Sequence, residues 1–155
     1  MKQQSTLEPE NWWEEILRYH GHVGPWNILG FRAGKLALDR LGVSWGSHLL
    51  HIELRIPRKT PYSCMADGLT VATGNSLGRL DIEIHEIESM KNIKIVFYKD
   101  RGTDNQRVLE VCPSQSLMEF IDLPTDDLEG LARDTMEKAD DDIFDEVRLS
   151  GVDRG

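Results

Sequence analysis

The sequence predicts an α+β fold, in which helices cover a mostly antiparallel sheet of about four strands. Residues 50–56 alternate strictly between apolar and polar side chains, which is typical of a strand with one buried face. Residues 25–41 carry apolar side chains at steps of three and four, which is typical of an amphipathic helix. Shorter alternating segments follow at 80–87, 93–98 and 106–112, and they supply the remaining strands.

The chain has the length of one domain. Its 155 residues can bury a sizeable core, and no repeat or flexible linker divides them. We therefore predict a single domain over residues 1–155, with a core over about 10–138, a loose leader at 1–8 and an acidic tail at 139–155. The run Asp140-Asp141-Asp142 lacks the spaced ligands and glycine of a calcium loop, so we expect a solvated helix end outside the functional site.

The composition excludes several classes of partner. A formal net charge of −9 argues against nucleic acid or anionic lipid as a general partner, because phosphate binding needs a basic surface. No segment approaches the roughly 20 apolar residues of a membrane span, and no signal-peptide run follows the start, so we expect a cytoplasmic protein. Cys64 and Cys112 are too few for a disulfide framework, and the absence of a Cys-x-x-Cys pair excludes a zinc ribbon.

The first two elements are predicted to be helices. Residues 10–19 place Trp12 and Trp13 on a short amphipathic helix, where adjacent tryptophans are typical of a core or a subunit interface. Pro25 can open the next helix, and Gly42 can end it. Gly30 and Gly34 lie four residues apart on that helix, which indicates that another backbone passes close to it.

The remaining elements follow from similar patterns. His51 lies on the polar face of the strand at 50–56, where we expect it to be exposed or salt-bridged. The strands at 80–87 and 93–98 are predicted to form a hairpin. Helices are expected at 64–74, 114–121 and 125–138, and Ile143, Phe144 and Val147 are possible docking residues of the tail.

The turn His20-Gly21-His22 is the first candidate site. Neutral imidazole is the commonest protein metal ligand, and the glycine between the two histidines allows both rings to converge. Two exposed loop histidines are the alternative interpretation. Both residues precede the start of the helix that Pro25 opens, where free N–H groups favour anions.

Cys64 is the second candidate, because it lies where a helix is predicted to begin. A helix N-terminus lowers the pKa of a thiol and so favours the thiolate that binds metals. The alternative is a small, buried, apolar cysteine.

These motifs resemble the opening of the FmdE family, which takes its name from a component of formylmethanofuran dehydrogenase. That family typically has a His-Gly-His-x-Cys-Pro-Gly run and a Gly-x-Arg-Ala helix, then a Cys-x-x-Asp helix and a Thr-Gly-Cys-Thr-x-Gly turn. The resemblance runs from about residue 12 to about residue 112. The matching stretches are His20-Gly21-His22-Val23-Gly24-Pro25, Gly30-Phe31-Arg32-Ala33-Gly34, Leu38-x-x-Leu41-Gly42, Cys64-Met65-Ala66-Asp67 and Thr73-Gly74-Asn75-Ser76-Leu77-Gly78.

The resemblance implies an α+β homodimer with a metal site, commonly zinc. Gly24 and Asn75 stand where the family usually has cysteines, so His20, His22 and Cys64 remain as the implied ligands. Three protein ligands leave one position open, as is expected of catalytic rather than structural zinc. A thiolate ligand favours zinc over magnesium or calcium and also suits nickel or iron. The paired tryptophans and the glycines at 30 and 34 add to the expectation of a homodimer.

Three functions are compatible with this site. The first is a metal-binding accessory protein of a molybdenum- or tungsten-dependent formylmethanofuran dehydrogenase-type enzyme, which would then be its partner. The second is a small zinc-dependent hydrolase or lyase, with Asp67 as the candidate proton carrier. The third is a metal-free dimeric binding module, in which loss of two cysteines reflects loss of the site.

Overall fold

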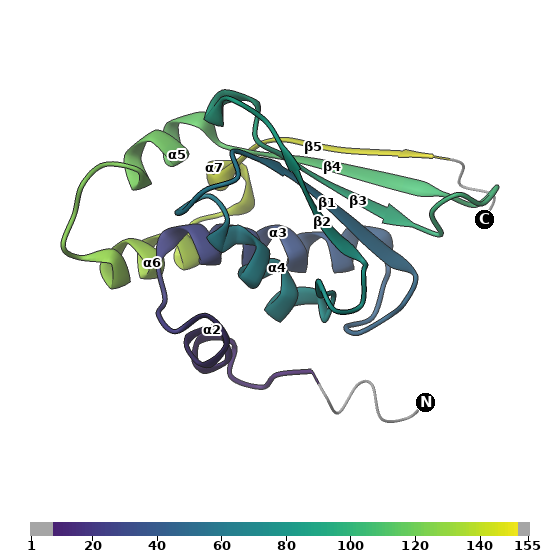
Figure 1. The fold of residues 1–155 in the computed structure, drawn as a ribbon, viewed down its shortest axis with the longest axis horizontal. Coiled ribbons are helices and arrows are strands. Elements are labelled where there is room, and N and C mark those ends of the chain that lie inside the picture. Colours follow the sequence, from purple (N-terminus) through teal and green to yellow (C-terminus); the bar gives the residue numbers. More distant parts are fainter. Residues whose placement is uncertain (1–7, 152–155) are drawn as a thin grey trace.

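A computed structural model describes residues 8–151, which form a five-stranded mixed sheet with helices packed against one face (Figure 1). The helices are α2 (Trp12–His20), α3 (Pro25–Leu41), α4 (Cys64–Thr73), α5 (Gln115–Ile121), α6 (Leu128–Glu137) and α7 (Asp140–Ile143). The strands are β1 (Leu50–Ile56), β2 (Ile82–Glu86), β3 (Lys94–Lys99), β4 (Arg107–Pro113) and β5 (Phe144–Gly151), and a 3-10 turn spans Met90–Asn92. The α+β prediction is confirmed. Residues 1–7 of the predicted leader lie outside the described residues.

The sheet has the order β2-β1-β3-β4-β5, with one parallel pair among antiparallel ones. The predicted hairpin of β2 and β3 is wrong, because these strands lie on opposite sides of β1. Ile52 pairs with Ile82 in the parallel ladder and with Phe97 in the antiparallel one. α4 supplies the long connection that a parallel pair requires, so β1, α4 and β2 form a β-α-β unit.

The acidic tail contributes a strand that the sequence patterns did not indicate. β5 pairs with β4 from Phe144 opposite Pro113 to Gly151 opposite Arg107. Ile143 and Phe144 are buried, which confirms their predicted docking. β5 is an edge strand whose remaining residues are largely exposed, so its composition resembles that of a solvated tail.

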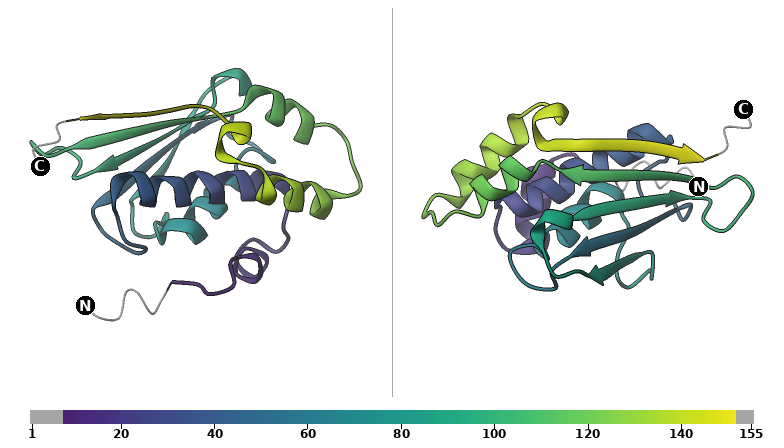
Figure 2. Two further views of the ribbon diagram at one scale, coloured as in Figure 1. Left: turned by 180° about the vertical axis from the view of Figure 1, so that it is seen from behind. Right: turned by 90° about the horizontal axis from the view of Figure 1, so that it is seen from above.

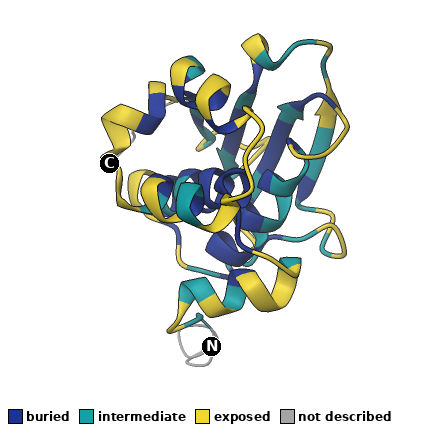
Figure 3. Cartoon of the chain, turned by 90° about the vertical axis from the view of Figure 1, so that its left-hand side faces the viewer, coloured by how far each residue is buried: buried dark blue, intermediate teal, exposed yellow. Residues whose placement is uncertain are grey.

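α3 lies at the centre of the molecule, between the sheet and α4, and buried residues concentrate there (Figure 3). A Cβ atom added to Gly30 would lie 2.2 Å from the carbonyl oxygen of Met65, and one added to Gly68 would lie 1.9 Å from that of Asn27. The prediction that a backbone passes close to Gly30 is therefore confirmed, and that backbone is α4 of the same chain.

α2, α3, α4 and α6 lie on one side of the sheet, and α5 lies beyond the end of β4, as the two views in Figure 2 show. The opposite face carries charged and polar side chains, including an ion pair of 2.7 Å between His51 and Glu83, so the expectation of a salt-bridged His51 is confirmed. α2 covers a second, smaller cluster of apolar residues with Trp12 and Trp13 packed against it. None of the helices within residues 8–151 has both the length and the apolar character needed to cross a bilayer.

Candidate functional site

The His-Gly-His turn connects the end of α2 to the start of α3. α2 ends at His20, and Gly21 takes a left-handed conformation with φ of +92°, so that its N–H donates to the carbonyl of Leu17. Pro25 then begins α3 as predicted. The turn is therefore a helix-capping segment that holds the two histidine backbones in place.

Asn27 fixes this turn to the first turn of α3. Its side-chain amide donates to the carbonyl of His22 at 3.1 Å and accepts from the N–H of Gly24 at 3.2 Å. Asn27 is buried, and the sequence patterns did not single it out. The available signal was its position three residues after the residue that precedes the helix, where a polar side chain commonly bonds back to the chain.

His20 and Asp67 form the closest polar contact of the site. The Nδ1 atom of His20 lies 2.6 Å from Oδ2 of Asp67, although 47 residues separate them. Because a carboxylate only accepts hydrogen bonds, Nδ1 carries the proton in this contact. The Nε2 atom of His20 is buried and has no hydrogen-bond partner among the described residues. Its ring lies beside that of His22, with 4.6 Å between centroids.

Cys64 is the first residue of α4, as the sequence predicts. Of the two interpretations of this cysteine, the lowered pKa that a helix N-terminus can produce is not found. Burial, followed by the negative charge of Asp67, raises the pKa of the Cys64 thiol, and these effects outweigh a backbone hydrogen bond that lowers it. The thiol is therefore protonated near neutral pH, and forming a thiolate there requires another positive charge nearby.

A cavity of about 740 Å³ brings His20, Cys64 and Asp67 to one place. It lies between α4 and the edge strand β2, and the end of α2 adjoins it. Thr60, Ser63 and Thr70 contribute hydroxyl groups to it. The apolar side chains that line it are those of Ala66, Leu77, Leu80, Ile82 and Ile84.

His22 faces a different hollow. It lines a cavity of about 520 Å³ together with Trp13 and the segment 125–129. Among residues 8–151, no three His, Cys, Asp or Glu side chains lie close enough together to hold a metal ion. Two of the three predicted ligands, His20 and Cys64, thus share a cavity. The third, His22, lines the other cavity, and its ring lies beside that of His20.

The two positions of the missing cysteines differ in their surroundings. A Cβ atom added to Gly24 would lie 3.7 Å from the ring of His22, so a side chain there would contact the predicted site. Asn75 is fully buried and points elsewhere, since its amide donates to the carbonyls of Leu50 at 2.8 Å and Asp81 at 3.0 Å. Asn75 therefore joins the loop before β2 to the start of β1.

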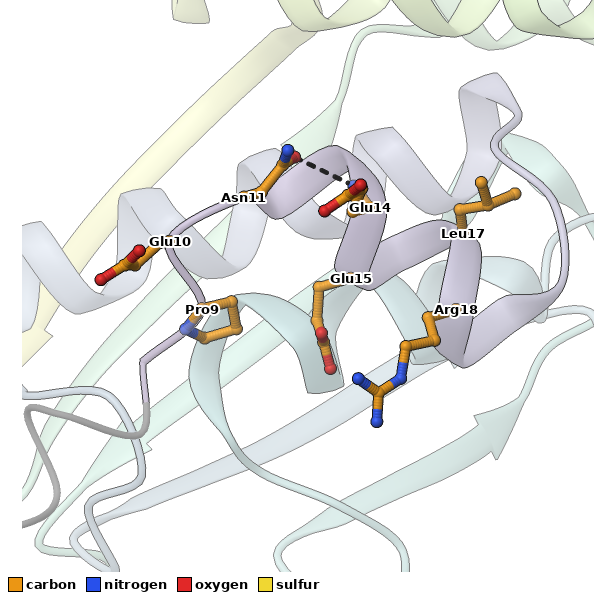
Figure 4. A pocket seen from close by; sticks show the side chains of 7 residues that line it. All are labelled: Pro9, Glu10, Asn11, Glu14, Glu15, Leu17 and Arg18. Atoms are coloured by element: carbon orange, nitrogen blue, oxygen red, sulfur yellow. Dashed lines mark hydrogen bonds between the residues drawn. The ribbon is translucent and has the colours of Figure 1, made fainter.

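The outer side of α2 carries another hollow, which Figure 4 shows in close-up. Its lining consists of Pro9, Leu17 and polar or charged residues, with neither histidine nor cysteine. The hydrogen bond between Asn11 and the N–H of Glu14 caps the helix. In Figure 4 the side chains of Glu10 and Leu17 point away from one another.

Comparisons with known proteins agree with the motifs. The family model described as "FmdE, Molybdenum formylmethanofuran dehydrogenase operon" matches residues 19–145. This range includes the histidine turn, α4 and most of the sheet, and the resemblance stated from the motifs is confirmed. A search of curated proteins gave no match.

Proposed function

This chain belongs to the FmdE family, and from that premise we propose that it is a metal-binding accessory protein of a molybdenum- or tungsten-dependent formylmethanofuran dehydrogenase-type enzyme. We propose zinc as the metal and His20, His22 and Cys64 as its ligands. The family description supports the association with that enzyme. The metal is supported by the geometry around His20.

The observation that carries the proposal is the state of the His20 ring. Histidine ligands of metals usually donate their second ring N–H to a carboxylate, which fixes the ring and makes the free nitrogen more basic. Asp67 stands in this relation to Nδ1 at 2.6 Å, and Nε2 is left without a partner among the described residues. His20 would be the anchoring ligand, and Asp67 its positioning residue.

The donors fit a transition metal in kind, because imidazole and thiolate suit zinc, nickel and iron. Their present arrangement does not close around an ion within residues 8–151, so the side chains of Cys64 or His22 would have to turn toward Nε2 of His20. A bound zinc would supply positive charge, and Cys64 would lose its thiol proton on joining it. His22 would complete the set from the turn that Asn27 holds.

A metal-free binding module is the second candidate. Two family thiols are absent, and the remaining Cys64 is protonated near neutral pH, both of which weaken a metal site. The cavity is nevertheless within the range of about 300–1,000 Å³ that is typical of small-molecule sites. A hydrolase or lyase gains less support, because one oxygen of Asp67 is already bonded to His20.

Metal content separates the two candidates. Protein stripped with a chelator should take up one equivalent of zinc, measured by elemental analysis and calorimetry. Cys64→Ser and His22→Ala should each lose most of this metal, and His85→Ala should retain it, because His85 pairs with Glu83 on the opposite face of the sheet. Full zinc binding by both Cys64→Ser and His22→Ala would rule out the proposed ligands.

Gly24→Cys provides a gain-of-function test. Its side chain would contact the ring of His22, and its backbone has φ of −132°, which any residue can adopt. The added thiol should raise zinc affinity if the site is placed correctly. Unchanged affinity in a folded Gly24→Cys protein would count against His22 as a ligand.

A further inference from the structure

We propose that the cavity between α4 and β2 binds an elongated amphipathic amine, with its ammonium group at Asp67 and its apolar body along the edge strand. The inference goes beyond metal binding and does not rest on it. It rests on three features of the cavity: a polar wall on α4 opposite an apolar wall on β2, a firmly held loop that carries two exposed leucines, and the carboxylate of Asp67.

The helical wall is mostly polar and follows one face of α4 and the residue before it. Ser63, Ala66, Asp67 and Thr70 all line the cavity, and they are spaced three, four and seven residues from Ser63. Residues at these steps lie on one face of a helix, one above the other. Asp67 lies near the middle of this face, where the end of α2 brings His20 against it.

The opposite wall is apolar. Ile82 and Ile84 alternate along β2 toward the cavity, and Leu77 and Leu80 extend this wall beyond the start of the strand. Leu77 is 76% exposed and Leu80 is 79% exposed, the two highest values among the large apolar side chains of the described chain. Two exposed leucines that line one cavity are typical of a surface that a ligand covers.

The loop that carries these leucines is firmly held. The guanidinium of Arg79 donates to the carbonyls of Gly74, at 2.9 Å, and Ser47, at 3.0 Å, and pairs with Asp81 at 3.0 Å. Leu80 has φ of +58°, which is unfavourable for a bulky side chain and persists only where surrounding contacts impose it. The fold therefore maintains the exposure of Leu80 instead of allowing the side chain to turn inward.

The charge of the cavity selects the polar end of the ligand. Oδ1 of Asp67 accepts no hydrogen bond from the described residues, and Oδ2 accepts one from His20. Arg58 is already engaged with the carbonyl of Ile84 and lies 3.8 Å from Glu86. The carboxylate of Glu83 is bonded to His51 and His85 on the other face of the sheet. Asp67 is thus the charge left for a ligand, and it favours an ammonium group, which has three donors.

The test uses three probes that share one apolar chain: hexylamine, hexan-1-ol and hexanoate. Binding to the full-length, chelator-treated protein is measured by NMR titration. Hexylamine should bind at least about tenfold more tightly than hexanoate, because a charge-assisted hydrogen bond replaces a like-charge contact. Asp67→Asn should remove most of this preference. Leu80→Ser should weaken all three probes by a similar factor, roughly threefold to tenfold.

Leu149→Ser is the matched control, since Leu149 is an exposed leucine on β5 and should not affect binding. No saturable binding of hexylamine, equal affinity for hexylamine and hexanoate, or an unchanged affinity in Leu80→Ser would each overturn the proposal. The comparison of probes needs only the wild-type chain, so it remains decisive if Asp67→Asn does not fold. His22→Ala should lose zinc and keep hexylamine binding, because His22 lines a different cavity, so failure of either proposal is recognised separately.

Discussion

At the scale of single residues, the properties of Cys64 depend on Asp67. Burial and then the charge of Asp67 raise the pKa of the thiol, so removal of that charge acts on the second cause alone. We predict that Asp67→Asn lowers the pKa of Cys64 and that alkylation by iodoacetamide at mildly alkaline pH becomes faster. The measurement belongs in a Cys112→Ser background, since Cys112 is the other thiol. An unchanged or slower rate would contradict the role of Asp67.

Glu83 gives a prediction of pH dependence. Hydrogen bonds from His85 and then His51 hold the pKa of Glu83 below its ordinary value. A lowered folded pKa stabilises the protein above the unfolded value, and this contribution is lost as the pH falls through the folded one. Glu83→Gln should therefore be less stable than wild type at neutral pH, by less than about 1 kcal/mol because the site is partly exposed.

This difference should shrink as the pH falls from the ordinary glutamate pKa of about 4.3 through the lower folded pKa of Glu83, where the carboxyl of the wild type also becomes neutral. Urea unfolding of both proteins at neutral and acidic pH measures it. Glu88→Gln is a suitable control, because Glu88 makes no ion pair with the described residues. If the difference in unfolding free energy between wild type and Glu83→Gln became larger on acidification, the prediction would be contradicted.

Residue patterns predict part of the site. His20 and Cys64 are identifiable because imidazole and thiol are recognisable ligands, and the structure brings both to one cavity. Arg79 escapes such patterns because its guanidinium bonds to the carbonyl of Ser47, which is distant in the sequence. Asn27 bonds locally, and its position near the start of α3 was a signal that could have identified it. The shift in the pKa of Cys64 depends first on burial, which the tertiary fold sets and local patterns do not reveal, and then on the charge of Asp67 three residues along α4.

At the scale of elements, the crossing of α3 and α4 depends on glycine. We predict that Gly68→Ala destabilises the fold by about 1–3 kcal/mol or more, because the new methyl group would meet the backbone of Asn27. Urea unfolding measures this loss. Gly78→Ala is the control, since the nearest atom to its added Cβ lies 4.0 Å away. Equal stability of the two variants would show that α4 can shift without cost.

The same scale explains where sequence patterns are insufficient. Alternation indicates that a segment is a strand, but not which strand it pairs with, so the predicted hairpin of β2 and β3 is wrong. β5 is not predicted because an edge strand with exposed residues has little apolar alternation. The helices are predicted closely, since proline, glycine and apolar spacing mark their ends locally.

Because β5 belongs to the sheet, we predict that deletion of residues 139–155 destabilises the protein. The deletion removes buried Ile143 and Phe144 and leaves β4 as an unpaired edge. Loss of Phe144 alone should cost about 3–5 kcal/mol, which thermal unfolding of Phe144→Ala can measure. A deletion variant as stable as the full chain would contradict the role of β5 in the sheet.

At the scale of the whole molecule, we propose a homodimer on the basis of the family resemblance. The tryptophans of α2 and the glycines of α3 add little to this proposal, because both make contacts inside one chain. Trp12 packs on Phe31 with 5.1 Å between ring centroids, and Gly30 accommodates α4. Light scattering at micromolar concentration should give twice the mass of the chain. Trp13→Ala should lower thermal stability without changing this mass, because Trp13 packs within its own chain. A monomer mass for wild type would exclude the homodimer.

Because β2 is an edge strand that lines the cavity, hydrogen–deuterium exchange of its amides can report whether the cavity is occupied. The N–H of Ile52 donates to the carbonyl of Asp81, and the N–H of Ile87 donates to that of Ile56. The backbone N–H and C=O groups of the odd-numbered residues from 81 to 87 therefore point toward β1. The amides of Ile82 and Ile84 then point away from the sheet and have no strand beside them among the described residues. They should acquire deuterium faster than the amides of β1, and an occupant of the cavity should slow them without any label.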